Sequence, residues 1–417
     1  MVAKSEPYSC ILTITGFEDS ITSLSFSPDG RHLAMGSYDG TMAIFVVPGG
    51  RVLSKIRLPE PVTSILYLPT NRNCVLVGCL DGNLVSVQAE TDEHWVNALS
   101  FSFEGPIEAL EYCTERAYVG IANGSQVSLL RLTKKGQLGY VAVSSTWVLP
   151  FTLHLSGSLF FVSRMQCPGG DRPASLAPQQ RESDMTLATS VCFMQDGSTL
   201  IASFMHYGLV CYDVDSGTIL WVIPCIGNIG RMTVAGDEQY CIACNLENGF
   251  DTYDLRLREL LWTTKVESNG FPLPVLFIHE DQHVLFGSAD GDVVIVCRKT
   301  DMVLQKLQHT KGDAIQTMAI CGGGPGTGFR YIATGSSGTR TYVKLWMAER
   351  RTVRFDEPEM VSMSQAHPSP NIVPVETQLD APPHIVHNMS PVQARRISPL
   401  PGIIVAVREC LYQPPII

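Results

Sequence analysis

The sequence predicts an all-β protein that folds as a seven-bladed β-propeller of four-stranded antiparallel blades. Three observations indicate this fold. Short polar turns that end in glycine recur at a regular spacing, a β-prone run lies on each side of every turn, and the spacing leaves room for four strands. A single four-stranded sheet cannot cover both of its faces, so several such units must stack around an axis.

The recurring turns set the period of the repeat. Their glycines lie at positions 40, 82, 124, 208, 249 and 291, which are 42, 42, 84, 41 and 42 residues apart. The long step equals two periods, and a seventh turn, Ser336-Ser337-Gly338, follows after 47 residues. A period of about 42 residues is typical of one propeller blade. The six regular turns are Tyr38-Asp39-Gly40, Leu80-Asp81-Gly82, Ala122-Asn123-Gly124, His206-Tyr207-Gly208, Glu247-Asn248-Gly249 and Ala289-Asp290-Gly291.

Each turn defines one repeat unit. The runs on its two sides form a hairpin, because Asp-Gly and Asn-Gly favour tight turns that need positive φ. One strand is expected upstream of the hairpin, and in most units a fourth lies downstream. The seven units cover residues 21–60, 61–105, 106–145, 186–225, 226–266, 272–309 and 313–349.

The last unit has no obvious fourth strand. The run Cys10–Gly16 precedes the first unit and has the composition of a strand. We expect it to close the ring as the outermost strand of the last blade, which would remove a free sheet edge that invites aggregation. The propeller then covers residues 10–349.

Two segments interrupt or leave the repeat. Residues 146–185 fill the double-length step and contain an apolar run, Trp147–Arg164, that is long enough for two strands. We interpret 146–185 as a loop-rich insertion between blades three and four, and a degenerate eighth blade is the alternative. Residues 350–417 are predicted to form a mostly disordered tail, because 351–417 carry 11 of the 26 prolines and lack the periodicity.

The tail contains three Ser-Pro pairs that are candidate phosphorylation sites, at Ser369, Ser390 and Ser398. Arg395 and Arg396 lie just before the third, a setting that favours kinases selecting basic residues. Phosphorylation would add roughly −1.5 to −2 charges per site.

The composition of the chain limits which kinds of binding partner and which cellular location we expect. A net charge of −10 argues against a general binder of nucleic acids or anionic membranes. No apolar run reaches the roughly 18 residues of a membrane span, and residues 1–10 lack the apolar core of a secretion signal. The 13 scattered cysteines suggest buried, reduced thiols rather than disulfides. We therefore expect a cytoplasmic or nuclear protein.

One short motif resembles a zinc site. His279-Glu280-Asp281-Gln282-His283 matches H-E-x-x-H, in which a helix turns two histidines toward one metal. Here the five residues join two predicted strands, 275–278 and 284–286, so a polar surface turn is expected instead. The sequence predicts no metal and no cofactor.

The first unit resembles a WD repeat closely, through Ser27-Pro28-Asp29-Gly30 and Ser37-Tyr38-Asp39-Gly40. The resemblance extends more loosely over residues 10–349. Gly16-Phe17 replaces the Gly-His pair of the WD-repeat family, and most units lack the Trp-Asp pair. The hydrogen-bonded Asp–His–Ser–Trp network of that family must therefore be incomplete here. The resemblance implies a non-enzymatic scaffold for protein–protein contacts.

Two alternatives to a general scaffold remain. Trp221 and Trp262, 41 residues apart, look like the repeats of quinoprotein dehydrogenase propellers, which are exported enzymes with a cofactor. Many of those enzymes carry adjacent cysteines, which this chain lacks, so aromatic packing of the outer strands is the preferred interpretation. The second alternative is a substrate-receptor subunit of a larger complex, and sequence does not separate it from the scaffold.

The geometry of the family places the recurring turns and the connections between blades on one rim. Tyr38, His206 and Tyr207 are the preferred contact residues there, because aromatic residues are enriched at interfaces. The aspartates have an alternative, structural role within their own turns. We expect a monomeric propeller within a complex of other proteins. The full set of candidate contact residues is Tyr38, Asp39, Asp81, Asn123, His206, Tyr207, Asn248 and Asp290.

Overall fold

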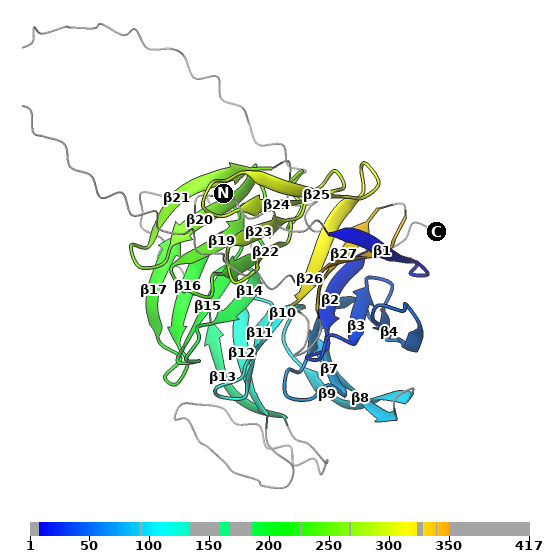
Figure 1. Cartoon of the computed structure of the whole chain (residues 1–417). Coiled ribbons are helices and arrows are strands. Elements are labelled where there is room, and N and C mark those ends of the chain that lie inside the picture. The colour runs from blue at the N-terminus through cyan, green and yellow to red at the C-terminus, as the bar shows by residue number, and fades with distance from the viewer. Residues whose placement is uncertain are drawn as a thin grey trace, which may run out of the picture. The chain divides into compact units, whose positions relative to one another are not determined.

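Seven antiparallel sheets of four strands each surround a common axis (Figure 1). The computed structural model describes residues 8–91, 94–132, 159–166, 186–225, 227–266, 268–322, 328–338 and 340–349. All elements within these ranges are strands, β1 to β28, which confirms the predicted seven-bladed propeller and gives no support to an eighth blade among them. The predicted tail and its three serines lie outside the described residues.

The first three blades occupy the N-terminal half of the ring. Blade 1 consists of β2 (Ile21–Phe26), β3 (His32–Ser37), β4 (Thr41–Val46) and β5 (Val52–Arg57). Blade 2 consists of β6 (Val62–Tyr67), β7 (Cys74–Cys79), β8 (Asn83–Thr91) and β9 (His94–Ser102). Blade 3 consists of β10 (Ile107–Cys113), β11 (Tyr118–Asn123), β12 (Gln126–Leu132) and β13 (Leu159–Gln166).

The remaining blades repeat the same order, and the last one includes the first strand of the chain. Blade 4 consists of β14 (Ala188–Phe193), β15 (Thr199–Phe204), β16 (Gly208–Asp213) and β17 (Ile219–Pro224). Blade 5 consists of β18 (Met232–Val234), β19 (Tyr240–Cys244), β20 (Gly249–Asp254) and β21 (Glu259–Lys265). Blade 6 consists of β22 (Val275–Ile278), β23 (His283–Phe286), β24 (Asp292–Cys297) and β25 (Val303–Gln308). Blade 7 consists of β26 (Ala314–Cys321), β27 (Phe329–Ser337), β28 (Val343–Glu349) and β1 (Ser9–Ile14).

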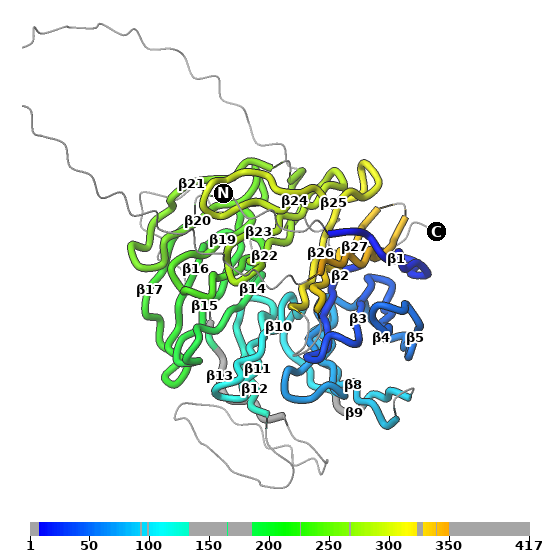
Figure 2. Tube along the Cα trace, in the orientation of Figure 1, coloured from blue at the N-terminus to red at the C-terminus, as the bar shows by residue number. Residues whose placement is uncertain are grey.

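The first strand of each blade lies nearest the axis, as the trace in Figure 2 shows for β2, β10, β14 and β26. The second strands β3, β7 and β15 are almost wholly buried because both of their faces pack against neighbouring blades. One such interface joins Leu76 and Leu84 of blade 2 to Ile107, Val119 and Ile121 of blade 3. The core is therefore a series of layers between blades, and each blade is stable only beside its neighbours.

The N-terminal strand closes the ring as predicted. β1 pairs antiparallel with β28, with Ile14 opposite Val343 and Leu12 opposite Leu345. Just before β1, the Tyr8 backbone N–H donates to Gln305 Oε1 (2.8 Å), and Gln305 Nε2 donates to the Tyr8 carbonyl (2.7 Å). These bonds fix the start of the closing strand to blade 6.

Blade 3 differs from the sequence prediction. Its fourth strand, β13, lies inside the segment 146–185 that we interpreted as an insertion between blades three and four. β13 pairs with β12 along its length, with Val127 opposite Met165. Residues 133–158 therefore lie within the sequence of blade 3, between its third and fourth strands.

A small residue on the second strand permits close packing of adjacent blades. A Cβ atom at Gly78 would lie 2.5 Å from Ile107 Cγ2 of blade 3, and one at Gly335 would lie 2.7 Å from Ile21 Cγ2 of blade 1. Gly36 meets Ile65 of blade 2 in the same way, at 2.9 Å. These distances are too short for a real Cβ atom. Only glycine therefore fits at this place in the second strand, where an isoleucine of the next blade approaches the backbone.

Blade 7 contains part of the hydrogen-bonded network expected from the WD-repeat resemblance. Trp346 Nε1 donates to Thr334 Oγ1 (2.9 Å), and the same hydroxyl lies 2.8 Å from His309 Nε2. His309 Nδ1 is buried without a partner among the described residues, and the turn of this blade carries Ser337 where the family has aspartate. The network is incomplete, as the sequence indicated.

Acid should destabilise the propeller through its buried histidines. Burial lowers the pKa of His309 to about 3, and the charge of Lys344 acts in the same direction. The unfolded chain therefore takes up the proton first, near the ordinary histidine pKa of about 6.5. The free energy of unfolding should be constant above that pH and fall as pH decreases toward 3.

Denaturant unfolding of the full chain between pH 7.5 and 4.5 measures this dependence. His309→Gln should flatten part of the slope. His94→Gln changes an exposed histidine of β9 and serves as the control for substitution of a histidine. An equal slope in wild type and His309→Gln would rule out His309 as a source of the acid sensitivity.

Candidate functional site

The turns between second and third strands share one end of the propeller with the connections between blades. We call this end the turn rim. Backbone hydrogen bonds join the two sets: Tyr38 N donates to Ser20 O (2.9 Å), Leu80 N to Pro61 O (3.0 Å), and Gly124 N to Pro106 O (3.0 Å). The predicted contact residues belong to these turns, so the fold places them on one rim.

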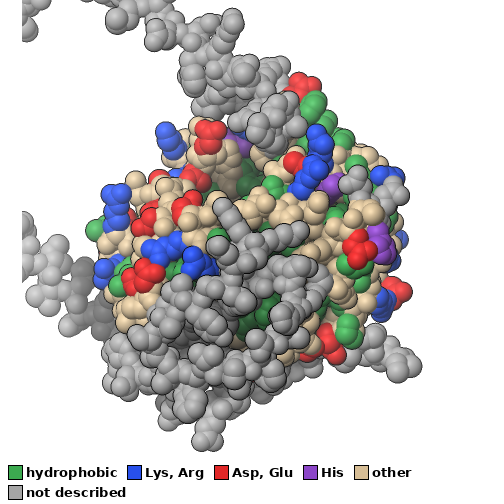
Figure 3. All heavy atoms as spheres, turned by 90° about the horizontal axis from the view of Figure 1, so that it is seen from below, with side chains coloured by type: hydrophobic (Ala, Val, Ile, Leu, Met, Phe, Trp, Pro, Cys, Tyr) green, Lys and Arg blue, Asp and Glu red, His purple; other side chains and the backbone are tan. Residues whose placement is uncertain are grey.

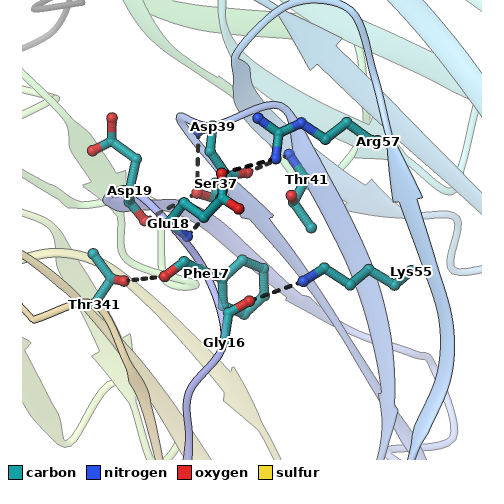
Figure 4. A network of polar contacts seen from close by, with 10 residues as sticks. All are labelled: Gly16, Phe17, Glu18, Asp19, Ser37, Asp39, Thr41, Lys55, Arg57 and Thr341. Carbon is teal, nitrogen blue, oxygen red and sulfur yellow. Dashed lines mark hydrogen bonds and ion pairs between the residues drawn. The ribbon is translucent and has the colours of Figure 1, made fainter. Parts of the chain in front are cut away.

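Asp39 has a structural function in blade 1 (Figure 4). Its carboxylate accepts hydrogen bonds from the backbone N–H of Thr41 (2.6 Å) and of Glu18 (2.7 Å). Burial alone would raise the pKa of Asp39, but these hydrogen bonds outweigh burial and hold it below the ordinary value. Asp39 thereby fixes the turn to the segment that enters blade 1, where Glu18 also pairs with Arg57 (3.1 Å).

Three further candidates take part in their own turns. Asp81 accepts from the Asn83 backbone N–H (3.0 Å) and from the Asn83 side chain. Asn248 accepts from Asn245 Nδ2 (2.9 Å). Asn123 is fully buried, donates to the Glu104 carbonyl (3.2 Å) and accepts from Ser128 (2.8 Å). The side chain of Asn123 therefore supports the turn and is not exposed to a partner.

The aromatic candidates remain accessible. Tyr38, His206 and Tyr207 are each partly exposed, and Asp290 is exposed. Burial raises the pKa of Tyr38 to about 12, and the negative charges of Asp19, Glu108 and Glu60 add to the effect. The Tyr38 hydroxyl therefore stays protonated. The negative potential around it comes from Asp19, Glu60 and Glu108.

The first strands of the blades line the central opening, and one residue near the start of each strand occupies an equivalent place there. The sequence analysis missed this set of residues. In blades 1, 2 and 4 the residue is a threonine whose hydroxyl lies near the carbonyl of the next blade, such as Thr22 to Val62 at 2.6 Å and Thr189 to Gly230 at 2.9 Å. The equivalent residues of blades 3 and 5 are Glu108 and Arg231. The sequence signal that could have revealed these residues is the Thr-Ser pair that recurs at 22–23, 63–64 and 189–190.

Arg231 extends across the opening. Its Nη2 donates to the carbonyl of Thr22 (3.3 Å), which belongs to blade 1. Burial lowers the pKa of Arg231, while the charge of Glu108 opposes that shift. Because blades 1 and 5 are not neighbours in the ring, Arg231 links opposite sides of the opening just below the turn rim.

The H-E-x-x-H motif forms the predicted turn between β22 and β23. His279, Glu280 and Asp281 all have positive φ, so the helical geometry of a zinc site is absent. His279 Nδ1 lies 2.9 Å from His283 Nδ1, and His279 Nε2 lies 2.8 Å from the Tyr8 hydroxyl. Across the described ranges, no three His, Cys, Asp or Glu side chains are grouped to hold a metal.

The cysteines and the surface charges of the described residues can be compared with what the composition predicts. The eleven cysteines of the described ranges are free thiols. Within the same ranges no helix has the length and apolar composition to cross a membrane. On the side of the molecule shown in Figure 3, basic and acidic side chains are interspersed.

Comparison with known proteins supports the class defined by this geometry. Residues 8–45 match the family model described as WD domain, G-beta repeat. Together with the seven four-stranded blades, this match defines a repeat protein of the propeller class. The first repeat of the chain is thus similar to a WD repeat, and the whole described ring has the propeller fold.

Several curated relatives are similar over part of the chain. Ribosome biogenesis protein BOP1 of Rattus norvegicus is 32% identical over 74 residues, which are 18% of this chain and 10% of that protein. Ribosome biogenesis protein ERB1 of Ajellomyces capsulatus is 25% identical over 189 residues, 42% of this chain and 22% of the relative. The BOP1 homolog of Arabidopsis thaliana is 32% identical over 89 residues, 21% and 12% of the two chains. The chain thus matches less than a quarter of each of these relatives.

Proposed function

We propose that this protein is a non-enzymatic scaffold that binds other proteins through its turn rim. The observation that carries the proposal is the rim itself, where a rigid ring presents partly exposed aromatic side chains beside a charged central opening. Binding residues on loops held by a rigid frame are typical of such folds. The acidic residues around the opening favour protein rather than nucleic-acid partners, because carboxylates repel phosphates.

The names of the relatives suggest a more specific process. We propose that the complex served by this scaffold takes part in ribosome biogenesis. Assembly of ribosomes in eukaryotic cells begins in the nucleus, so this proposal favours the nuclear alternative over the cytoplasmic one. The substrate-receptor alternative differs only in the identity of the partners.

Affinity capture from native cells tests the scaffold. The full chain is compared with a chain ending at Glu349, where β28 ends, and with the rim variant Tyr38→Ala/Tyr207→Ala. Partners retained without the tail but lost in the rim variant are the expected result. Leu257→Ala is the control, since Leu257 is 66% exposed on the turn between β20 and β21, at the opposite end of its blade.

Two outcomes separate the general proposal from the specific one. The captured partners could be unrelated to ribosome assembly, with no co-sedimentation of the protein with ribosomal precursors. That result would contradict the proposed role in ribosome biogenesis, while the proposed scaffold function would stand. An absence of any specific partner would contradict the scaffold itself.

A further inference from the structure

A cleft opens at the turn rim between blade 2 and the connection that leads into it from blade 1. Its volume is about 340 Å³, at the lower end of the roughly 300–1,000 Å³ of ligand pockets. Leu58 and Pro59 of the connection between the blades and Val85 of β8 provide apolar walls. Such a space accommodates one or two inserted side chains rather than a folded domain.

Two acidic residues line this cleft, and none of its lining residues is cationic. The carboxylates belong to Glu60, in the connection between the blades, and to Asp81, in the turn of blade 2. Within the described part of the chain, no hydrogen bond or ion pair engages the Glu60 carboxylate. Arg57, the cation nearest in sequence, already pairs with Glu18 (3.1 Å). The negative charge of the cleft is therefore available to a partner.

The field of these carboxylates extends beyond the cleft. Burial, together with the charges of Asp81 and Glu60, raises the pKa of the Cys79 thiol at its wall to about 12. Glu60 also contributes to the raised pKa of Tyr38. The cleft and the Tyr38 side of the opening thus share one negative potential, which attracts positively charged segments.

We infer that the cleft binds a basic segment of a partner protein by accepting a lysine or arginine side chain. The aliphatic stem packs on Leu58, Pro59 and Val85, and the charged head group pairs with Glu60 and Asp81. The inference rests on the proposed scaffold function and gives the chemistry of the partner at one part of the rim. A resident metal ion is a poorer occupant, because it would leave the apolar walls formed by Leu58, Pro59 and Val85 uncovered.

Fluorescence anisotropy of the full chain tests this site with a labelled short peptide in which arginine alternates with alanine. Wild type should bind it, and the affinity should decrease as salt is raised. Glu60→Gln/Asp81→Asn should weaken binding at least about tenfold, equivalent to about 1.4 kcal/mol. The Asn substitution keeps an acceptor for the turn hydrogen bond, so the fold is retained.

The control removes the same charge from other blades. Glu247→Gln/Asp301→Asn changes two exposed carboxylates of blades 5 and 6 that are not among the candidate contact residues and should alter affinity less than about twofold. Asn97→Arg adds a cation at an exposed position of β9 in the cleft wall and should abolish binding without altering a turn.

Three results would overturn the inference: no binding by wild type, equal binding by the glutamine counterpart of the peptide, or equal losses in the two double variants. Cellular partners that are captured normally by Glu60→Gln/Asp81→Asn would also contradict the cleft, while the scaffold proposal would stand.

Discussion

A chain lacking residues 1–15 should unfold at a temperature lower by about 10 °C or more. Deletion removes Ile11, Leu12 and Ile14, which pack into the core beside β28. Ile14 is buried and Ile11 and Leu12 are partly buried, so together they contribute several kcal/mol, at about 1.5–3 kcal/mol for a fully buried side chain. In a large domain, 1 kcal/mol corresponds to about 2–4 °C. The open edge of β28 should also promote aggregation.

Circular dichroism melts and size-exclusion chromatography measure both effects. Deletion of residues 1–7 alone is the matched control, because it leaves Tyr8 and β1 intact, and its melting temperature should equal that of the full chain. Equal melting temperatures for the two deletions would show that closure by β1 contributes little to stability.

Gly78→Ala should lower the free energy of unfolding by about 1–3 kcal/mol, the usual cost of overpacking a core. The added methyl group would lie 2.5 Å from Ile107 Cγ2, so blades 2 and 3 must separate to admit it. Chemical denaturation measures the change.

Gly49→Ala is the control for this variant, because a Cβ there meets no atom within 4 Å. A Gly78→Ala protein as stable as Gly49→Ala would indicate that the blades adjust freely, contrary to the layered packing described above.

The seven recurring turns predicted the seven blades, and the missing fourth strand of the last unit predicted the closing strand. Tight turns and β-prone runs depend on local sequence, and local signals recur wherever the repeat does. The fourth strand of blade 3 was assigned to the insertion instead, because β13 (Leu159–Gln166) begins far along the chain from its partner β12. No periodic pattern reveals a strand displaced in this way.

The candidate site was predicted less completely. The shared rim of Tyr38 and Asp39 followed from the repeat. Arg231 and Thr22 are 209 residues apart in the sequence, and their contact depends on how blades 1 and 5 are placed across the opening. The cleft beside Glu60 depends on how blade 2 meets the connection that precedes it. Such contacts arise from tertiary geometry, which no single repeat encodes.

The position of β1 beside β28 has a mechanical consequence. Ser9 lies opposite Met347, so the two ends of the folded ring leave from the same end of one antiparallel strand pair. A force that pulls these ends apart would load the inter-strand hydrogen bonds one after another, as in unzipping, rather than all together in shear. Tension between the two ends of the chain would therefore open the ring at this pair first.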